Sequence, residues 1–174
     1  MSSSAAIDDL LRRYASGQYF SQLINHPQPH RLRQPPELVY HATVNAVEPA
    51  FTIVMPTFNH ESNIADSLEA AANSASCPFD CILVDDGSED GTVERARAFF
   101  ESRPSPLVAR ATIVHNPVPV YETACDNLGF TLAETEVIVE VQADIQIREQ
   151  GFDALMLQGR SSSPLPSAIS GRCV

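Results

Sequence analysis

The sequence predicts an α/β fold built on a parallel sheet. From residue 51 onward, short apolar runs alternate with segments in which apolar residues recur at helical spacing. Such alternation is typical of βαβ units, whose right-handed crossovers give a Rossmann-like parallel sheet with helices on both faces. The apolar runs end in polar residues, and ligands of open α/β sheets bind where strands end and helices begin. We therefore expect a ligand site along one edge of this sheet.

Residues 1–49 are expected to form an N-terminal extension, followed by one domain over residues 50–174. Residues 5–15 are predicted to be a helix, because apolar side chains recur at i, i+3, i+4 and i+7, namely Ile7, Leu10, Leu11 and Tyr14. Residues 25–37 are proline-rich and are interpreted as a linker. A strand is predicted over Leu38–Val47.

The domain is expected to contain four strands, at residues 51–56, 80–85, 111–115 and 137–141. The first run, at 51–56, is apolar throughout, as expected for a parallel strand buried on both faces. Helices are predicted to follow the four strands, at about residues 61–75, 90–101, 121–134 and 150–158. We expect Asn59 or Ser62 to cap the first of these helices.

Composition limits the size of the fold and the classes of partner. A chain of 174 residues, 44% of them hydrophobic, is typical of one globular domain with a sizeable core. The net charge of −11 argues against nucleic acid, because nucleic-acid-binding proteins present a basic face. No apolar run reaches the ~20 residues that span a bilayer, and the N-terminus lacks the features of a secretory signal. We therefore expect no transmembrane segment and a cytoplasmic location.

The absence of lysine excludes several enzyme classes. All 11 basic residues are arginines, so the chain has no lysine for a Schiff base, a P-loop or a receiver domain. The sequence also contains no G-x-G-x-x-G, which disfavours a dinucleotide-dependent dehydrogenase.

Two segments at strand ends carry a family resemblance. They read Pro56-Thr57-Phe58-Asn59-His60-Glu61 and Val84-Asp85-Asp86-Gly87-Ser88-Glu89-Asp90-Gly91-Thr92. The sequence resembles the inverting glycosyltransferases of family two, whose first two strands typically end in P-T-Y-N-E and V-D-D-G-S-x-D-G-T. The resemblance covers roughly residues 50–158, the first half of a GT-A domain, and implies the strand order 3-2-1-4. We therefore expect a truncated domain whose catalytic base lies beyond residue 174.

The resemblance also implies a nucleotide site. An aspartate at the second strand end can accept a hydrogen bond from a uracil imide, and the ring of Phe58 can stack. Asn127 matches the asparagine of the family helix x-A-R-N-x-G, whereas Asp126 replaces its arginine. The expected nucleotide-binding residues are Pro56, Thr57, Phe58, Glu61, Asp85, Asp86 and Asn127. As alternatives, Asp85 and Asp86 form only a turn, and Glu61 is only a first-turn helix acid.

A metal site is implied by the segment Gln142-Ala143-Asp144, where the family carries D-x-D. The resemblance implies that Asp144 and Gln142 hold Mg²⁺ or Mn²⁺ against the diphosphate of the donor. Carboxylate and amide oxygens are suitable ligands for such hard cations. The alternative for Asp144 is an ordinary helix or turn cap.

The expected activity is therefore that of a hexosyltransferase-like glycosyltransferase. It would transfer a sugar from a UDP- or GDP-linked donor to an acceptor, with metal assistance and inversion. The alternative is a non-catalytic or truncated nucleotide-sugar-binding module. We also expect self-association, because the sheet would expose the edge at which later strands of the domain normally pair.

Overall fold

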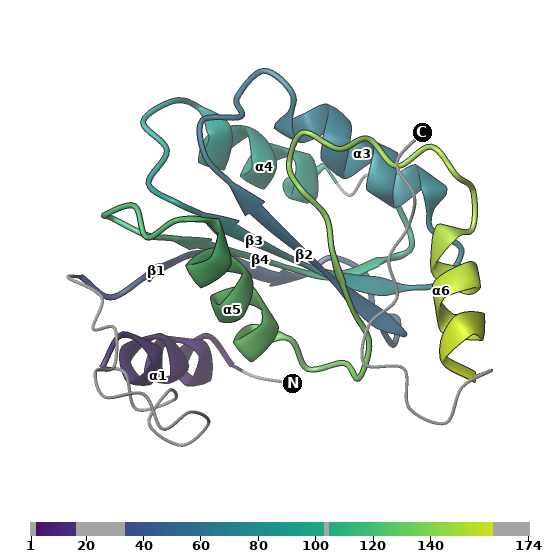
Figure 1. The fold of residues 1–174 in the computed structure, drawn as a ribbon, viewed down its shortest axis with the longest axis horizontal. Helices are drawn as coiled ribbons and strands as arrows, with labels where there is room; N and C mark the ends of the chain where they lie inside the picture. Colours follow the sequence, from purple (N-terminus) through teal and green to yellow (C-terminus); the bar gives the residue numbers. More distant parts are fainter. Residues whose placement is uncertain (1–2, 17–33, 103–104, 162–174) are drawn as a thin grey trace.

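The computed structural model of the protein describes residues 3–16, 34–102 and 105–161 (Figure 1). One five-stranded sheet has the order β1-β4-β3-β2-β5. Its strands are β1 (Glu37–Thr43), β2 (Phe51–Thr57), β3 (Phe79–Asp85), β4 (Val108–His115) and β5 (Ile138–Glu140). The pairs β2–β3, β2–β5 and β3–β4 are parallel. The predicted α/β class and the order 3-2-1-4 are thus confirmed for the four strands after residue 50.

Helices cover both faces of the sheet, as predicted. They are α1 (Ser4–Ala15), α3 (Ile64–Ser74), α4 (Thr92–Glu101), α5 (Glu122–Leu132) and α6 (Phe152–Ser161). Helices α3 and α4 lie on one face, and α1 and α5 lie on the other (Figure 1). Alternate side chains of β2 pack on opposite faces of the sheet. Ile53 packs with α3 and α4, whereas Val54 packs with α1 and α5. Every residue of β2 and β3 is buried, which explains why apolar residues predominate in both strands.

Helix α5 approaches β2 closely because residue 129 is a glycine. A Cβ atom at Gly129 would lie 2.3 Å from Val54 Cγ1, closer than side chains can approach. The missing side chain therefore lets α5 lie directly on the sheet, with its N-terminus beside the end of β3. This contact helps to place the first turn of α5 at the ligand-binding edge.

The N-terminal helix packs on the same face as α5. Ile7, Leu11 and Tyr14 are buried, as their helical spacing predicted, and the Tyr14 hydroxyl donates to Ala124 O at 3.0 Å. The predicted strand at 38–47 is observed at Glu37–Thr43, where it pairs antiparallel with β4. Most of the predicted linker at 25–37 lies outside the described residues.

The capping prediction for α3 is wrong. This helix begins at Ile64, and its N-cap is Asn63, whose side chain makes no capping hydrogen bond. Asn59 instead has a positive φ of 54°, and its side chain accepts a hydrogen bond from the Glu89 N–H at 3.0 Å. The competing bond to the next loop therefore determines the position of Asn59. Among the described helices, none has the length and hydropathy needed to cross a bilayer.

Candidate functional site

The carboxyl ends of β2, β3, β4 and β5 lie along one edge of the sheet, which we call the rim. The loop after β2 begins at Phe58, the loop after β3 begins at Asp86, and Asn116 follows β4. Gln142 and Asp144 follow β5. Parallel pairing therefore brings most of the predicted site residues to the same edge, where open α/β sheets bind ligands.

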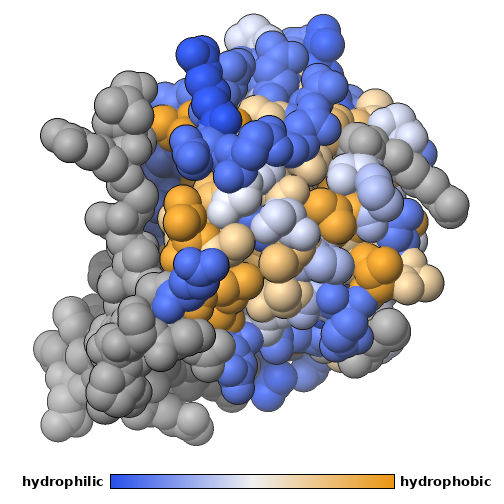
Figure 2. All heavy atoms as spheres, turned by 90° about the vertical axis from the view of Figure 1, so that its right-hand side faces the viewer, coloured by the Kyte–Doolittle hydropathy of each residue, from blue (hydrophilic) through white to orange (hydrophobic). Residues whose placement is uncertain are grey.

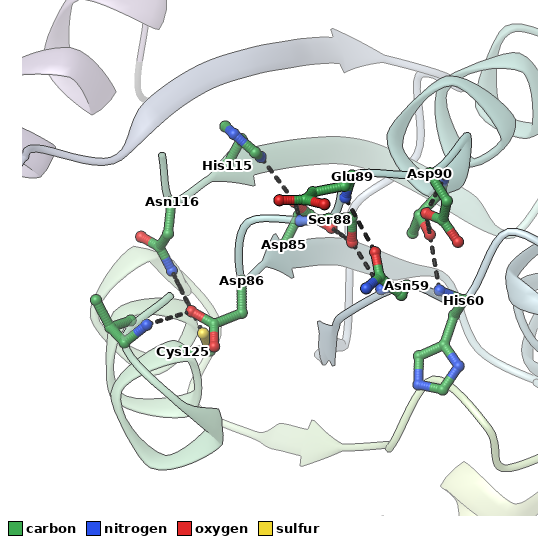
Figure 3. A network of polar contacts seen from close by, with 12 residues as sticks. Asn59, His60, Asp85, Asp86, Ser88, Glu89, Asp90, His115, Asn116 and Cys125 are labelled. Atoms are coloured by element: carbon green, nitrogen blue, oxygen red, sulfur yellow. Dashed lines mark hydrogen bonds and ion pairs between the residues drawn. The ribbon is translucent and has the colours of Figure 1, made fainter. Parts of the chain in front are cut away.

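The loops after β2 and β3 are joined by direct hydrogen bonds (Figure 3). Ser88 Oγ accepts from the Asn59 N–H at 2.8 Å, and Asp90 Oδ2 accepts from the Glu61 N–H at 3.0 Å. Glu61 returns a bond by accepting from the Gly91 N–H at 3.2 Å, and it pairs with Arg95 at 3.4 Å. These bonds fix the geometry of the two loops relative to each other.

Asp85 is fully buried at the end of β3, where its carboxylate has three donors. The Ser88 N–H donates to Oδ2 at 3.0 Å, and the Ser88 hydroxyl donates to Oδ1. His115 Nδ1, from the end of β4, lies 2.7 Å from Oδ2. Asp85 therefore connects the turn after β3 with the neighbouring strand end.

Asp86 holds the segment that leads into α5. Its carboxylate accepts from the Val120 N–H at 2.7 Å and from the Tyr121 N–H at 2.9 Å. Asn116 Nδ2 lies 3.4 Å from Asp86 Oδ1 and also contacts the buried thiol of Cys125 (Figure 3). Burial, with the nearby charge of Asp86, raises the pKa of the Cys125 thiol, so this thiol stays protonated.

The predicted nucleotide-binding residues of β2 differ in exposure. Pro56 and Thr57 are buried, whereas the Phe58 side chain beyond them is 48% exposed. Within the described structure, Thr57 Oγ1 is a buried oxygen with no hydrogen-bond partner. Such an atom requires an explanation, and one explanation is a polar ligand at the rim. Asn127 lies in the middle of α5 and is exposed.

The predicted metal ligands lie beyond β5. Asp144 is exposed, and Gln142 is half-buried with its Nε2 donating to Glu122 at 2.6 Å and to Glu140 at 2.9 Å. The amide group is therefore oriented by two carboxylates. Across the described ranges, no three side chains among His, Cys, Asp and Glu form a group that could hold a metal ion by themselves.

Negative charges crowd this part of the rim. Burial raises the pKa of Glu140, and the nearby charges of Asp126 and Glu122 raise it further. Burial followed by the charge of Glu122 raises the pKa of Asp126, whose Oδ1 has no hydrogen-bond partner in the described ranges. The acids next to α5 therefore have fewer donors than Asp85 and Asp86, since Glu122 and Glu140 share the amide of Gln142.

Three residues of the rim were not predicted from the sequence. His115 is the last residue of β4 and Asn116 follows it, and they contact the two aspartates. Tyr121 precedes α5 with a positive φ of 71°. The polar pair after the apolar run of β4 is a signal that could have identified His115 and Asn116. No sequence pattern indicates the backbone conformation of Tyr121.

A family comparison matches most of the domain. The model of "Glycosyl transferase family 2" matches residues 52–157, which is more than half of the chain. The chain therefore belongs to glycosyl transferase family 2.

Curated relatives are longer than this chain. The undecaprenyl-phosphate 4-deoxy-4-formamido-L-arabinose transferase of Pseudomonas fluorescens is 30% identical over 110 residues, which are 62% of this chain and 31% of that protein. The protein of the same name from Pseudomonas savastanoi pv. phaseolicola is 29% identical over 118 residues, 60% of this chain and 34% of that protein. The chain thus spans about a third of the length of these relatives.

Solved structures share the fold. S. aureus TarS 1-349 in complex with UDP superposes with a TM-score of 0.52 at 20% identity, covering 64% of this chain and 32% of that one. The mannosyltransferase PcManGT from Pyrobaculum calidifontis, in complex with GDP-Man and Mn²⁺, gives 0.50 at 23% identity, covering 80% and 39%. Likeness at this identity shows the fold alone, and that fold is GT-A.

Proposed function

We propose that this member of glycosyl transferase family 2 binds the nucleotide of a UDP- or GDP-linked sugar at the rim. The bound donor would then transfer its sugar to an acceptor hydroxyl with inversion. The observation that carries the proposal is the fixed geometry of the loops after β2 and β3. Their hydrogen bonds hold the two family segments in one orientation relative to each other. Preorganised polar groups are what a binding site for a nucleotide needs.

The proposed nucleotide-binding set keeps the residues expected from the sequence, but their roles differ. Thr57 supplies a buried hydroxyl without a partner, and Phe58 supplies an exposed ring for stacking. Asp86 uses both oxygens internally, yet within the described residues Oδ2 accepts from the Tyr121 N–H alone and can accept a second hydrogen bond, for example from a base N–H. Asp85 and Glu61 position the two loops. Pro56 and Asn127 complete the proposed set.

The residues after β5 fit a divalent cation only together with the donor. Gln142 Nε2 is used by two carboxylates, which leaves Oε1 as a ligand beside the Asp144 carboxylate. Mg²⁺ is usually held by one or two carboxylates together with substrate phosphates, so two protein oxygens are sufficient. A bound Mg²⁺ or Mn²⁺ would neutralise charge on the diphosphate leaving group. The Mn²⁺ and GDP-Man present with the mannosyltransferase PcManGT support this choice of cation and donor.

A second candidate function is nucleotide-sugar binding without transfer. The excess of acids around α5 favours it, because Asp126 stands where the family carries an arginine that faces donor phosphates. Burial, followed by the charges of neighbouring acids, raises the pKa of Asp126 and of Glu140, so negative charge is disfavoured at both positions. A donor diphosphate would meet repulsion here unless a cation is bound with it.

Calorimetry with UDP and GDP, with and without Mn²⁺, tests the proposal. We expect one nucleotide to bind the chain, more tightly with Mn²⁺, and Thr57→Val to weaken binding roughly five- to tenfold, as loss of one hydrogen bond predicts. Ser102→Ala, which removes an exposed hydroxyl at the end of α4, serves as the control. Failure of the chain to bind either nucleotide would overturn the proposal. Binding without transfer to an acceptor would favour the second candidate.

We also propose that the chain self-associates through β5. This strand ends the described sheet, and its backbone pairs with β2 on one side. Figure 2 shows apolar side chains on the face of the molecule on the side of α6. The exposed large apolar side chains include Ile138 of β5, which is 37% exposed, and Leu155 of α6, which is 60% exposed. An open strand edge beside apolar surface promotes pairing between chains. Sedimentation velocity should show oligomers that Ile138→Lys reduces, and a monomeric parent chain at high concentration would contradict this.

A further inference from the structure

Tyr121 has a backbone conformation that is unfavourable for any side chain. Its φ is 71° and its ψ is 159°, a region that glycine occupies almost exclusively. A positive φ is a genuine outlier for a bulky residue. Asn59 is the other non-glycine residue with positive φ in the described ranges, but asparagine tolerates this conformation.

Asp86 maintains this conformation. Its carboxylate, in a residue that is only 8% exposed, accepts the N–H groups of both Val120 and Tyr121. Bonds to a buried charged acceptor are among the stronger hydrogen bonds in proteins. The strain at residue 121 is therefore imposed by a buried contact and does not arise from a freely moving loop.

The Tyr121 side chain contributes nothing to the core. It is 82% exposed, the largest exposed fraction among the large apolar side chains of the described structure. A glycine would relieve the backbone, and any small residue would leave the packing unchanged. Strain that persists without a packing benefit points to a role at the site that the strained residue adjoins.

A second exposed aromatic residue adjoins the same aspartate. The Asp86 N–H donates to Thr57 O at 2.8 Å, so Phe58 follows directly after the residue that Asp86 contacts. Phe58 is 48% exposed, and Tyr121 is bonded to the carboxylate of the same Asp86. The backbone N–H of Asp86 is thus bonded to the residue before Phe58, and the carboxylate of Asp86 is bonded to Tyr121.

We propose that Tyr121 is a second stacking residue for the nucleobase, acting with Phe58 on the base held beside Asp86. This inference rests on the proposed nucleotide-binding function and adds a residue that the family motifs do not mark. Aromatic side chains stack on any base, so the ring contributes affinity, whereas polar contacts select the base. The strained backbone serves to present the ring at the rim instead of against the protein.

Four variants of the full chain test this role, with UDP and GDP titrated by calorimetry and each variant followed by thermal denaturation. Tyr121→Gly and Tyr121→Ala should lower nucleotide affinity roughly five- to a hundredfold, the range for loss of one aromatic–base stack. Tyr121→Phe should bind within about twofold of the parent. Phe130→Ala removes a 41% exposed ring elsewhere on α5 and should leave binding unchanged.

The stability readout separates a binding role from a structural role. Tyr121→Gly should melt at or above the temperature of the parent, because glycine relieves the strain, even though it loses affinity. If Tyr121→Gly and Tyr121→Ala bind nucleotide like the parent, this inference alone is overturned. If the parent itself binds neither nucleotide, the proposed function fails, and this inference fails with it. If Tyr121→Gly melts at a lower temperature than the parent and Tyr121→Phe also loses affinity, Tyr121 has a structural role and the inference is overturned.

Discussion

The two halves of the rim differ in how their acids are satisfied. Over β2 and β3, Asp85 and Asp86 each accept several N–H or O–H donors from neighbouring loops. Over β5 and α5, Glu122 and Glu140 share the single amide of Gln142. The first half is held together by its own acids, whereas the acids of the second half have one shared side-chain donor. The acids of the first half are therefore satisfied within the protein, and the second half is where the proposed cation would bind.

The direction of the pKa shifts follows the same division. A hydrogen bond from the Thr92 hydroxyl, with further bonds from backbone N–H groups, holds the pKa of Asp90 below its ordinary value. Burial and like charges raise the pKa of Glu140 and of Asp126. The pKa shifts of carboxyl groups on one edge of the sheet thus differ in sign. Hydrogen bonds dominate the shift of Asp90, whereas burial and like charges dominate the shifts of Asp126 and Glu140.

Among the substitutions that test this difference between the two halves, Asp86→Ala should have the largest effect on the free energy of unfolding. Asp86→Ala leaves the N–H groups of Val120 and Tyr121 without their acceptor, which we expect to lower the free energy of unfolding by about 2–4 kcal/mol. Asp144→Ala, an exposed acid of the second half, should change it by less than about 0.5 kcal/mol. Urea denaturation measures both. Equal effects of the two variants would show that the halves do not differ as described.

An added acid in the second half should have an intermediate effect. Gln142→Asp removes the donor shared by Glu122 and Glu140 and adds a negative charge, so we expect a loss of about 1 kcal/mol, small because both glutamates are exposed. Mn²⁺ with UDP should reverse the loss, and Mn²⁺ should bind the variant more tightly than the parent. Gln146→Asp, on the loop that follows, is the matched control. Unchanged Mn²⁺ affinity would mean that residue 142 does not contact the cation.

Neutralising Glu140 should have the smallest effect, with a sign that depends on pH. Because the folded pKa of Glu140 is raised above 4.5, its contribution to stability is complete below that pH and is lost as the pH rises through the folded pKa. Glu140→Gln should therefore stabilise the chain by about 0.5 kcal/mol at pH 7 and low salt, after allowance for solvent screening.

The gain from Glu140→Gln should vanish near pH 4, where the parent side chain is also neutral. Denaturation of both proteins at the two pH values measures this difference, with Glu149→Gln as an exposed control. A gain that is equal at both pH values would argue against charge repulsion around α5.

The sequence predicted the central strands well because their burial on both faces leaves continuous apolar runs. It placed the start of β4 three residues too late, at 111, because Arg110 interrupts the run. That charge is compensated by Asp80 on the neighbouring strand and by Glu134 at 2.6 Å. Such compensation depends on the register of two strands and cannot be inferred from either strand alone.

The site was predictable to the same extent. The motifs located Asp85 and Asp86 at the end of β3, and the structure places them there. Their donors could not be predicted, because His115 and Tyr121 reach them only through the pairing of β3 with β4 and the path into α5. The binding roles of the predicted residues stay predictions.

The antiparallel strand β1 has a consequence for the order of events during synthesis. His41 of β1 contacts Thr112 of β4, 71 residues later in the chain. A ribosome adds roughly 5–20 residues per second, so β1 emerges several seconds before its partner exists. Strands β2 and β3 are made within that interval and can pair with each other first. The first strand to be synthesised is therefore among the last to join the sheet, and until then its backbone needs water or a chaperone as its partner.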